Sequence, residues 1–303
     1  MMFDSVDSVQ EALAKHDYIA ERGLSTSIFL ALKTGKPLFL EGDAGVGKTE
    51  IAKVLSAMLD TDLIRLQCYE GLDTSTALYE WDYASQMLHL RLMEASGSNR
   101  TAMEGELFSR RFLQARPLLQ AVEASKNGHV PVLLIDELDR SDEEFEAFLL
   151  EILSDFQVTI PEIGTIKAEQ PPVVIVTSNR TREIHDALKR RCLYYWIDYP
   201  TFQKELEIVR RKAPEVEEIL ARQITAFIQE MRRMELFKRP GVAETLDWTA
   251  ALIALDQSAL DLEIVEDTLG VILKYQDDIN MMDKETLQNL LDRAKVEATR
   301  VQG

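Results

Sequence analysis

The stretch Gly42-Asp43-Ala44-Gly45-Val46-Gly47-Lys48-Thr49 decides the fold of this chain. It fits the phosphate-binding pattern G-x-x-x-x-G-K-[ST] at every fixed position. In such a loop the glycines let backbone amides turn towards a polyphosphate, Lys48 can reach the β- and γ-phosphates, and Thr49 can ligate Mg²⁺. The sequence therefore predicts a triphosphate-binding loop whose contacts extend from Gly42 to Glu50.

The segments on either side of the loop support this interpretation. Residues 37–40 form a short apolar run that suits a buried strand. After the loop, apolar residues recur at helical spacing, at Ile51, Val54, Leu55, Met58 and Leu59. A strand, a glycine loop and an amphipathic helix thus follow one another as a phosphate loop requires. The alternative, a glycine-rich turn with an incidental lysine, leaves this flanking pattern unexplained.

Composition places the chain among ordinary globular proteins. It has 303 residues, of which 46% are hydrophobic and 28% charged. The net charge of −18 opposes broad attachment to nucleic acid or to an anionic membrane. No apolar run approaches the roughly 18 residues of a membrane span, and the first residues lack the order of a signal peptide, so we expect a cytoplasmic protein. The two cysteines and four histidines show no metal-ligand spacing, so no zinc site is predicted.

A second motif follows the apolar run over residues 130–135. Asp136 and Glu137 stand at the carboxyl end of this predicted strand, which is the edge where ligands bind in open α/β sheets. Asp136 is suited to hold Mg²⁺, and Glu137 to polarise a water for attack on the γ-phosphate. Acidic residues also follow strands as helix caps, so the motif is weak alone and specific only together with the phosphate loop.

Polar residues also flank the next two predicted strands. Asn179 ends the apolar run 173–177, where it could sense the γ-phosphate and orient the water, although a lone asparagine there is commonly a turn residue. Further on, Arg190 and Arg191 precede an aromatic strand at 193–197. They either satisfy the dipole of a helix C-terminus or present a guanidinium to the γ-phosphate of a neighbouring copy.

Three further segments carry weaker signals. Residues 5–34 are predicted to be helical with a break near Tyr18 and Ile19, which are candidate neighbours of an adenine base or plain packing residues. Within residues 79–92, the period-two alternation of Leu88, Leu90 and Leu92 predicts a small hairpin or inserted element, and residues 95–105 are loop-like. Residues 157–167 are typical of a projecting β-hairpin.

The character of the chain changes near residue 200. Residues 1–200 alternate predicted strands and helices, which is typical of an α/β domain. Residues 201–303 are almost purely helical in pattern and strongly acidic, and we interpret the acidic residues as a solvated face. The sequence therefore predicts two domains.

The motifs occur in the order seen in AAA+ ATPases. Within that superfamily, LFLEGDAGVGKTE, LLIDELDRSDEEFEAFLLEILSDFQVTI and VVIVTSNRTREI resemble the loop, the Asp-Glu strand with its helix, and the sensor strand of the MoxR family. The segments LKRRCLYYWIDYP and KRPGVAETLDW look most like the CoxD branch. Members of that branch are linked to maturation of a molybdenum- and copper-containing carbon monoxide dehydrogenase. The resemblance covers nearly the whole chain.

The resemblance implies an architecture and an assembly. The core would be five parallel strands with helices on both faces, with an insert in the second helix and a C-terminal helical lid. Six copies would form a homohexameric ring that holds ATP and Mg²⁺ between subunits. The ring would act on a client metalloenzyme, together with a partner that carries a von Willebrand factor A domain.

The resemblance also gives each motif a role. Lys48 and Thr49 would bind phosphate and Mg²⁺, Asp136 would support the metal, Glu137 would activate water, and Asn179 would be the first sensor. The candidate arginine finger, supplied to the neighbouring copy, is Arg191 with Arg190 as the alternative.

One residue departs from the pattern of related ATPases. They place a second sensor arginine after a lid glycine, whereas here Glu244 stands near that position and Arg239 precedes Gly241. Either Arg239 substitutes for the sensor or the contact is missing.

Two other functions fit the same motifs. A nucleic-acid motor or loader would need a basic, ring-facing surface and salt-sensitive DNA binding, against which the net charge argues. A nucleotide-gated scaffold would bind ATP with little hydrolysis. Hydrolysis measured against protein concentration separates such a scaffold from a ring with shared sites.

Overall fold

The computed structural model describes residues 3–95, 106–125 and 129–300, which form two compact units. The first unit comprises Met1–Val9, Arg22–Glu41 and Thr49–Trp196, and the second comprises Gln10–Glu21, Gly42–Lys48 and Ile197–Gly303. The phosphate loop up to Lys48 therefore groups with the C-terminal helices, whereas Thr49 groups with the sheet. No helix among the described residues is long and apolar enough to cross a membrane.

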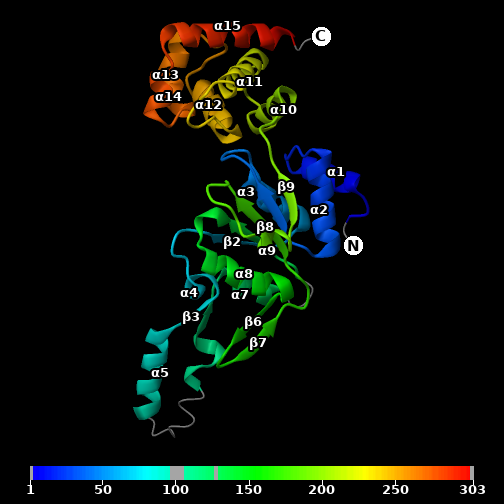
Figure 1. The fold of residues 1–303 in the computed structure, drawn as a ribbon, viewed down its shortest axis with the longest axis vertical. Coiled ribbons are helices and arrows are strands. Elements are labelled where there is room, and N and C mark those ends of the chain that lie inside the picture. Colours follow the sequence, from blue (N-terminus) through cyan, green and yellow to red (C-terminus); the bar gives the residue numbers. More distant parts are fainter. Residues whose placement is uncertain (1–2, 96–105, 126–128, 301–303) are drawn as a thin grey trace. The chain divides into compact units, whose positions relative to one another are not determined.

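The first unit is built on a five-stranded sheet whose pairings are all parallel (Figure 1). The strand order is β2-β5-β8-β1-β9. The bounds are β1 Leu38–Glu41, β2 Leu63–Gln67, β5 Val132–Asp136, β8 Val173–Ser178 and β9 Leu193–Trp196. The central strands are continuous apolar runs because helices cover both faces of the sheet. The predicted core of five parallel strands with helices on both faces is confirmed.

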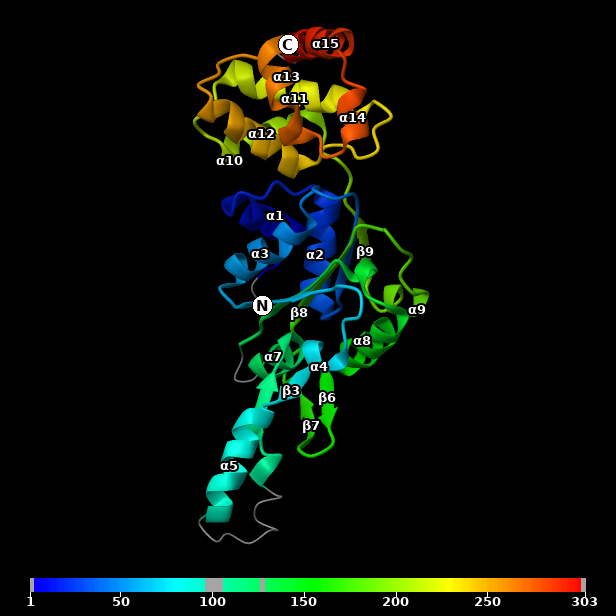
Figure 2. The same ribbon diagram turned by 90° about the vertical axis from the view of Figure 1, so that its left-hand side faces the viewer.

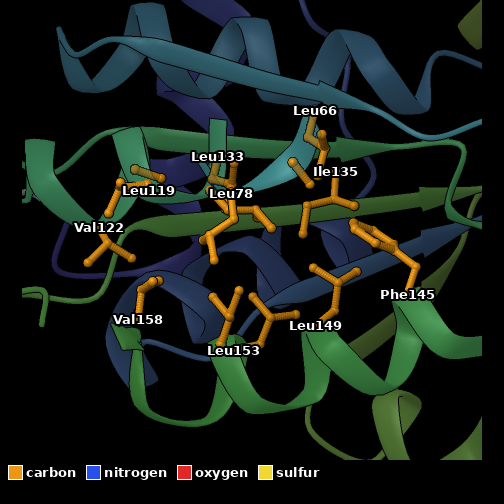
Figure 3. Packing of buried hydrophobic residues seen from close by; sticks show 14 of the residues in the cluster. Leu66, Leu78, Leu119, Val122, Leu133, Ile135, Phe145, Leu149, Leu153 and Val158 are labelled. Atoms are coloured by element: carbon orange, nitrogen blue, oxygen red, sulfur yellow. The ribbon is translucent and has the colours of Figure 1, made fainter. Parts of the chain in front are cut away.

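Helices before and between the strands supply buried side chains to the hydrophobic core of this unit. Their bounds are α2 Arg22–Thr34, α3 Lys48–Leu59, α7 Pro117–Ala124, α8 Glu143–Asp155 and α9 Asp186–Lys189, with a 3₁₀ turn η3 at Leu138–Arg140. On α8, Phe145, Leu149 and Leu153 point towards Leu133 and Ile135 of β5 (Figure 3). Each such side chain, once fully buried, contributes about 1.5–3 kcal/mol. This packing fixes α8 against the strand that ends in Asp136.

The segment predicted as a hairpin or insert contains a helix. β3 (Tyr79–Trp81) pairs with β4 (Leu113–Ala115), and α5 (Tyr83–Ala95) comes between them in the chain. Figure 2 shows α5 and the neighbouring β3. Asp82 begins α5, because its Oδ1 accepts a hydrogen bond from the Ser85 amide at 3.0 Å. The alternating Leu88 and Leu92 are 62% and 61% exposed on this helix, so their spacing does not mark a buried sheet face. Residues 96–105 of the predicted insert lie outside the described residues.

Shorter elements complete the first unit. Over the residues predicted as a hairpin, β6 (Gln157–Ile160) pairs antiparallel with β7 (Gly164–Lys167). α4 spans Thr74–Ala77, and a 3₁₀ turn η1 spans Arg110–Phe112.

The second unit is mainly a helical bundle with its own core. Its helices are α10 Phe202–Lys212, α11 Glu218–Arg232, α12 Val242–Ala254, α13 Leu262–Ile272, α14 Gln276–Asn280 and α15 Lys284–Arg300 (Figure 2). Phe227 packs against the fully buried Trp248, whose Nε1 donates to Thr268 Oγ1 at 2.8 Å. α1 (Val6–Lys15) contributes residues to both units.

Candidate active site

In the first unit, Asp136 is the polar centre of the carboxyl edge of the sheet. The residue is only 2% exposed. Its Oδ1 accepts hydrogen bonds from Thr49 Oγ1 at 3.0 Å and from Thr177 Oγ1 at 2.6 Å, and its Oδ2 accepts one from Arg65 NH2 at 2.6 Å. The structure thus brings together Thr49 and Asp136, the two residues predicted to support a metal, although they are 87 positions apart in the sequence.

Glu137 follows Asp136 in a left-handed backbone conformation, with φ of 55°. This region is uncommon for a residue other than glycine, and such conformations gather at functional sites. Its amide donates to Thr177 Oγ1 at 2.9 Å, which fixes the turn. Its carboxylate accepts hydrogen bonds from Gln67 Nε2 at 3.0 Å and from Asn179 Nδ2 at 3.5 Å. The predicted first sensor Asn179 therefore faces the predicted catalytic carboxylate.

Three members of this cluster were not predicted from the sequence. Arg65 and Gln67 on β2 reach Asp136 and Glu137, and Thr177 on β8 touches both. The signal lay in the alternation of residues 63–67, which puts both polar side chains of β2 on one face of the strand. The register of the sheet then pairs Gln67 with Asp136. Only this pairing, which the sequence does not specify, turns the alternation into a site.

Asp139 fixes the loop that carries Asn179. This carboxylate is 4% exposed and accepts hydrogen bonds from the Asn179 amide at 3.1 Å, the Thr181 amide at 2.9 Å and Thr181 Oγ1 at 2.6 Å. Burial alone would raise the pKa of Asp139, but the hydrogen bonds from Thr181 and Asn179 outweigh it and hold the pKa below its ordinary value of 3.8. The ionised form is therefore the one that the fold stabilises.

This arrangement predicts a pH-dependent loss of stability in an Asp139→Asn variant. The pKa of Asp139 is lower in the folded state, so the carboxylate stabilises the fold above its unfolded pKa, and that contribution disappears as the pH falls through the folded pKa. We expect the variant to lose about 2 kcal/mol of unfolding free energy at pH 7, and less below roughly pH 4. Urea unfolding of the wild type and the variant, at pH 7 and below roughly pH 4, measures this loss of unfolding free energy.

A matched control for this experiment is Asp155→Asn at the exposed end of α8, which should change stability by less than about 0.5 kcal/mol. A deficit in the Asp139→Asn variant that stayed the same at both pH values would contradict the role given to the charge.

The two candidate finger arginines lie at the end of α9. Arg191 is exposed, and its guanidinium donates from Nε to Ser154 Oγ at 2.8 Å and from NH1 to the Ala187 carbonyl at 3.1 Å. The second bond satisfies a carbonyl of α9, as the helix-terminus interpretation expects. Arg190 caps the same helix and is also exposed. Both arginines belong to the first unit, and their role towards a neighbouring copy stays a prediction.

In the second unit, the phosphate loop is packed against the start of α12. Gly45, at φ of 80°, and Gly241 approach so closely that a Cβ on Gly241 would lie 2.8 Å from Gly45 Cα. Both positions therefore exclude a side chain. The Val242 amide donates to the Gly45 carbonyl at 2.9 Å, and Lys48 Nζ donates to the carbonyls of Gly42 and Asp43 at 2.7 Å each. Beyond the loop, Glu50 forms an ion pair with Lys53.

A buried ion pair holds the segment that touches the loop. Arg232 donates from NH1 and NH2 to Glu205 at 2.6 and 2.7 Å, and from Nε to the Pro240 carbonyl at 2.7 Å. Thr245 Oγ1 also donates to Glu205 at 2.7 Å. The charges are thus paired and hydrogen-bonded, as buried charges must be, and Pro240 precedes the glycine that contacts the loop.

Near the expected second sensor, the structure places a carboxylate. Glu244 Oε2 accepts a hydrogen bond from the Gly241 amide at 2.9 Å and would lie 2.9 Å from a Cβ on Gly45. Arg239 is exposed and lies near Tyr199. The pKa of the Tyr199 hydroxyl is raised to about 12, because burial and the neighbouring Asp43 raise it by more than Arg232 and Arg239 lower it.

The two candidate base neighbours lie in the same unit as the phosphate loop. Ile19 lines a cavity of about 490 Å³, together with Glu21 and with Lys204 of α10. Lys204 Nζ and Glu21 Oε1 form an ion pair at 2.8 Å. Tyr18 is partly buried, and its amide donates to the Leu13 carbonyl at 3.0 Å. The adenine role of both residues stays a prediction.

Known proteins match this chain at the level of a family. Residues 37–192, just over half of the chain, match the AAA domain of the dynein-related subfamily. An uncharacterized protein of Staphylococcus epidermidis is 25% identical over 237 residues, which cover 76% of this chain and 80% of that protein. An uncharacterized protein of Staphylococcus aureus strain NCTC 8325 is 26% identical over 227 residues, which cover 73% of this chain and 76% of that protein. The solved structure of a mutant RuvB from Thermotoga maritima aligns with a TM-score of 0.48 and 19% identity, over 91% of this chain and 73% of that chain. From the domain match, the chain belongs to the AAA domain family, in its dynein-related subfamily.

Proposed function

We propose that this protein is a MoxR-type AAA+ ATPase, most like the CoxD branch, which hydrolyses ATP in a ring of identical copies to remodel a client metalloenzyme. The observation that carries the ATPase proposal is the cluster of Thr49, Asp136, Glu137 and Asn179 at one edge of the sheet. Membership of the AAA family supports ATP binding and hydrolysis in general. The ring, the client and a von Willebrand factor A partner are supported by the sequence resemblance alone.

The donor set of the cluster fits Mg²⁺. This ion prefers oxygen ligands and, in ATPase sites, uses one or two protein oxygens together with substrate phosphates. Thr49 Oγ1 and Asp136 Oδ1, 3.0 Å apart, offer a hydroxyl and a carboxylate oxygen. These residues would hold the ion, which supplies positive charge against the phosphates. Among the residues described, no group of three or more His, Cys, Asp or Glu could hold a metal unaided, which is consistent with a site completed by substrate.

The other residues would divide the work of hydrolysis. The amides of the loop and Lys48 would bind the phosphates, and Lys48 is joined directly to Thr49 in α3. Glu137 would accept the proton of the attacking water, and Asn179, which faces it, would orient that water. Gln67 holds one oxygen of Glu137 in place. Arg191 of a neighbouring copy would stabilise the charge that develops on the γ-phosphate.

Phosphate release from Mg-ATP tests the proposed activity. The wild-type protein should hydrolyse ATP, and a Lys48→Ala variant should lose binding of a fluorescent ATP analogue and at least about a hundred-fold in turnover. A matched control is Lys53→Ala on the exposed face of the same helix, which should hydrolyse ATP normally. Wild-type turnover no higher than that of Lys48→Ala would contradict the proposal.

The same phosphate-release assay, run with added DNA, tests the alternative function as a nucleic-acid motor or loader. With a net charge of −18, we expect no salt-sensitive binding of single- or double-stranded DNA and no stimulation of hydrolysis by either. Stimulation by DNA that is lost with added salt would favour a motor or loader instead.

A further inference from the structure

The loop from Asn179 to His185 joins two parts of the proposed catalytic machinery within the first unit. At its start, Asn179 follows β8 and faces Glu137. At its end, His185 is the N-cap of α9, the helix that carries Arg190 and Arg191. Any side chain that fixes this loop therefore influences the site of its own copy, the presentation of the arginines, or both.

Two buried carboxylates hold this loop at different points. Asp139 of η3 binds Asn179 and Thr181, close to the sensor. Glu146 of α8, which is only 1% exposed, binds the far end. Its Oε1 pairs with Arg182 NH2, and its Oε2 accepts a hydrogen bond from the His185 amide at 2.7 Å. Arg182 NH2 also donates to the Ser141 carbonyl at 2.7 Å, which ties the same arginine to the start of α8.

Because Glu146 is buried, its carboxylate must keep its hydrogen-bonding partners. A carboxylate removed from water is tolerated only when its oxygens are paired and hydrogen-bonded, and loss of one partner leaves an uncompensated charge. The pair therefore admits one arrangement of residues 182–185 against α8. The packing of Leu188 in the core, where it is fully buried, extends that constraint into α9.

We propose that Glu146 is a positioning residue that acts through Arg182 and His185 to hold α9 so that Arg191 reaches the active site of the neighbouring copy. Asp139 independently fixes Asn179, so loss of Glu146 leaves the site of its own copy intact. This inference rests on the proposed function, because it needs a site shared between copies. Asp139 thus serves the active site of its own copy, whereas Glu146 serves the active site of the neighbouring copy.

Mixtures of two variants test this division. A Glu137→Gln copy lacks the catalytic carboxylate but retains its arginines, whereas a Glu146→Gln copy retains its own site. Glu146→Gln alone should bind ATP normally and lose about ten- to hundred-fold in kcat, because a shift of Arg191 by about 1 Å has an effect of that size. Added Glu137→Gln copies should supply well-placed arginines, so phosphate release per Glu146→Gln copy should rise several-fold. Asp139→Asn copies, whose own sensor is displaced, should show no such rise.

Controls make each outcome decisive. Glu151→Gln, the same change at an exposed position of α8, should keep wild-type kcat. Arg182→Gln breaks the same pair from the partly exposed side and replaces Glu146→Gln if that variant does not fold. A rise for Arg191→Ala mixtures without one for Glu146→Gln or Arg182→Gln would overturn the inference and leave the shared site standing. No rise for Arg191→Ala mixtures would remove the shared site, and this inference with it.

Discussion

Replacing Glu137 with glutamine is expected to leave ATP binding intact while lowering turnover by about a thousand-fold. The amide keeps the shape of the side chain and one acceptor oxygen, so it keeps one of the two hydrogen bonds that Gln67 and Asn179 donate to the carboxylate, but it cannot accept the proton of the attacking water. The backbone of Glu137 is set by Thr177 rather than by its own side chain, so the turn should survive the change. Equilibrium binding of a fluorescent ATP analogue and single-turnover phosphate release separate the two effects.

The control for this experiment is Glu144→Gln, an exposed carboxylate in the first turn of α8, which should turn over ATP at the wild-type rate. Turnover by Glu137→Gln that matched this control would remove Glu137 from its proposed role.

The second large effect is expected at Arg191. An Arg191→Ala variant should lose about a thousand-fold in kcat, in the range that arginine fingers contribute, with little change in ATP binding. The bonds from Arg191 to Ser154 and to the Ala187 carbonyl aim its guanidinium, whereas Arg190 caps the helix. Arg190→Ala, a matched change one residue earlier, should cost less than about ten-fold.

A helix-terminus role predicts a different result for both arginines. Each would then contribute at most about 1 kcal/mol to stability, and neither would matter for turnover. Thermal unfolding of the two variants, measured beside kcat, distinguishes that role from the finger. A larger loss of kcat at Arg190 than at Arg191 would exchange their assignments.

Much of the site could be predicted because its motifs stand at the ends of strands. A parallel sheet covered on both faces requires continuous apolar runs, and the residue after each run must lie at the carboxyl edge. Asp136 and Asn179 were found in this way. Their approach to Thr49 and Glu137 then follows from the strand order β2-β5-β8-β1-β9, which the structure supplies.

The missed features depend on pairings that no local pattern encodes. Gln67 joins the site only because the register sets it beside Asp136. The close approach of Gly45 and Gly241 joins positions almost 200 residues apart. In α5, the spacing of Leu88 and Leu92 suited a strand equally well, and the cap at Asp82 decides for a helix. The grouping of residues 42–48 with the C-terminal helices likewise rests on tertiary contacts such as Val242 with Gly45.

The central claim is that ATP is split at a site to which two copies of the chain contribute. Phosphate release per copy should therefore be measured across protein concentration, with the assembly state followed in the same samples by sedimentation velocity. We predict that the rate per copy rises in step with the assembled fraction, and that Arg191→Ala abolishes this rise without preventing assembly. Equal rates in solitary and assembled copies would contradict the account.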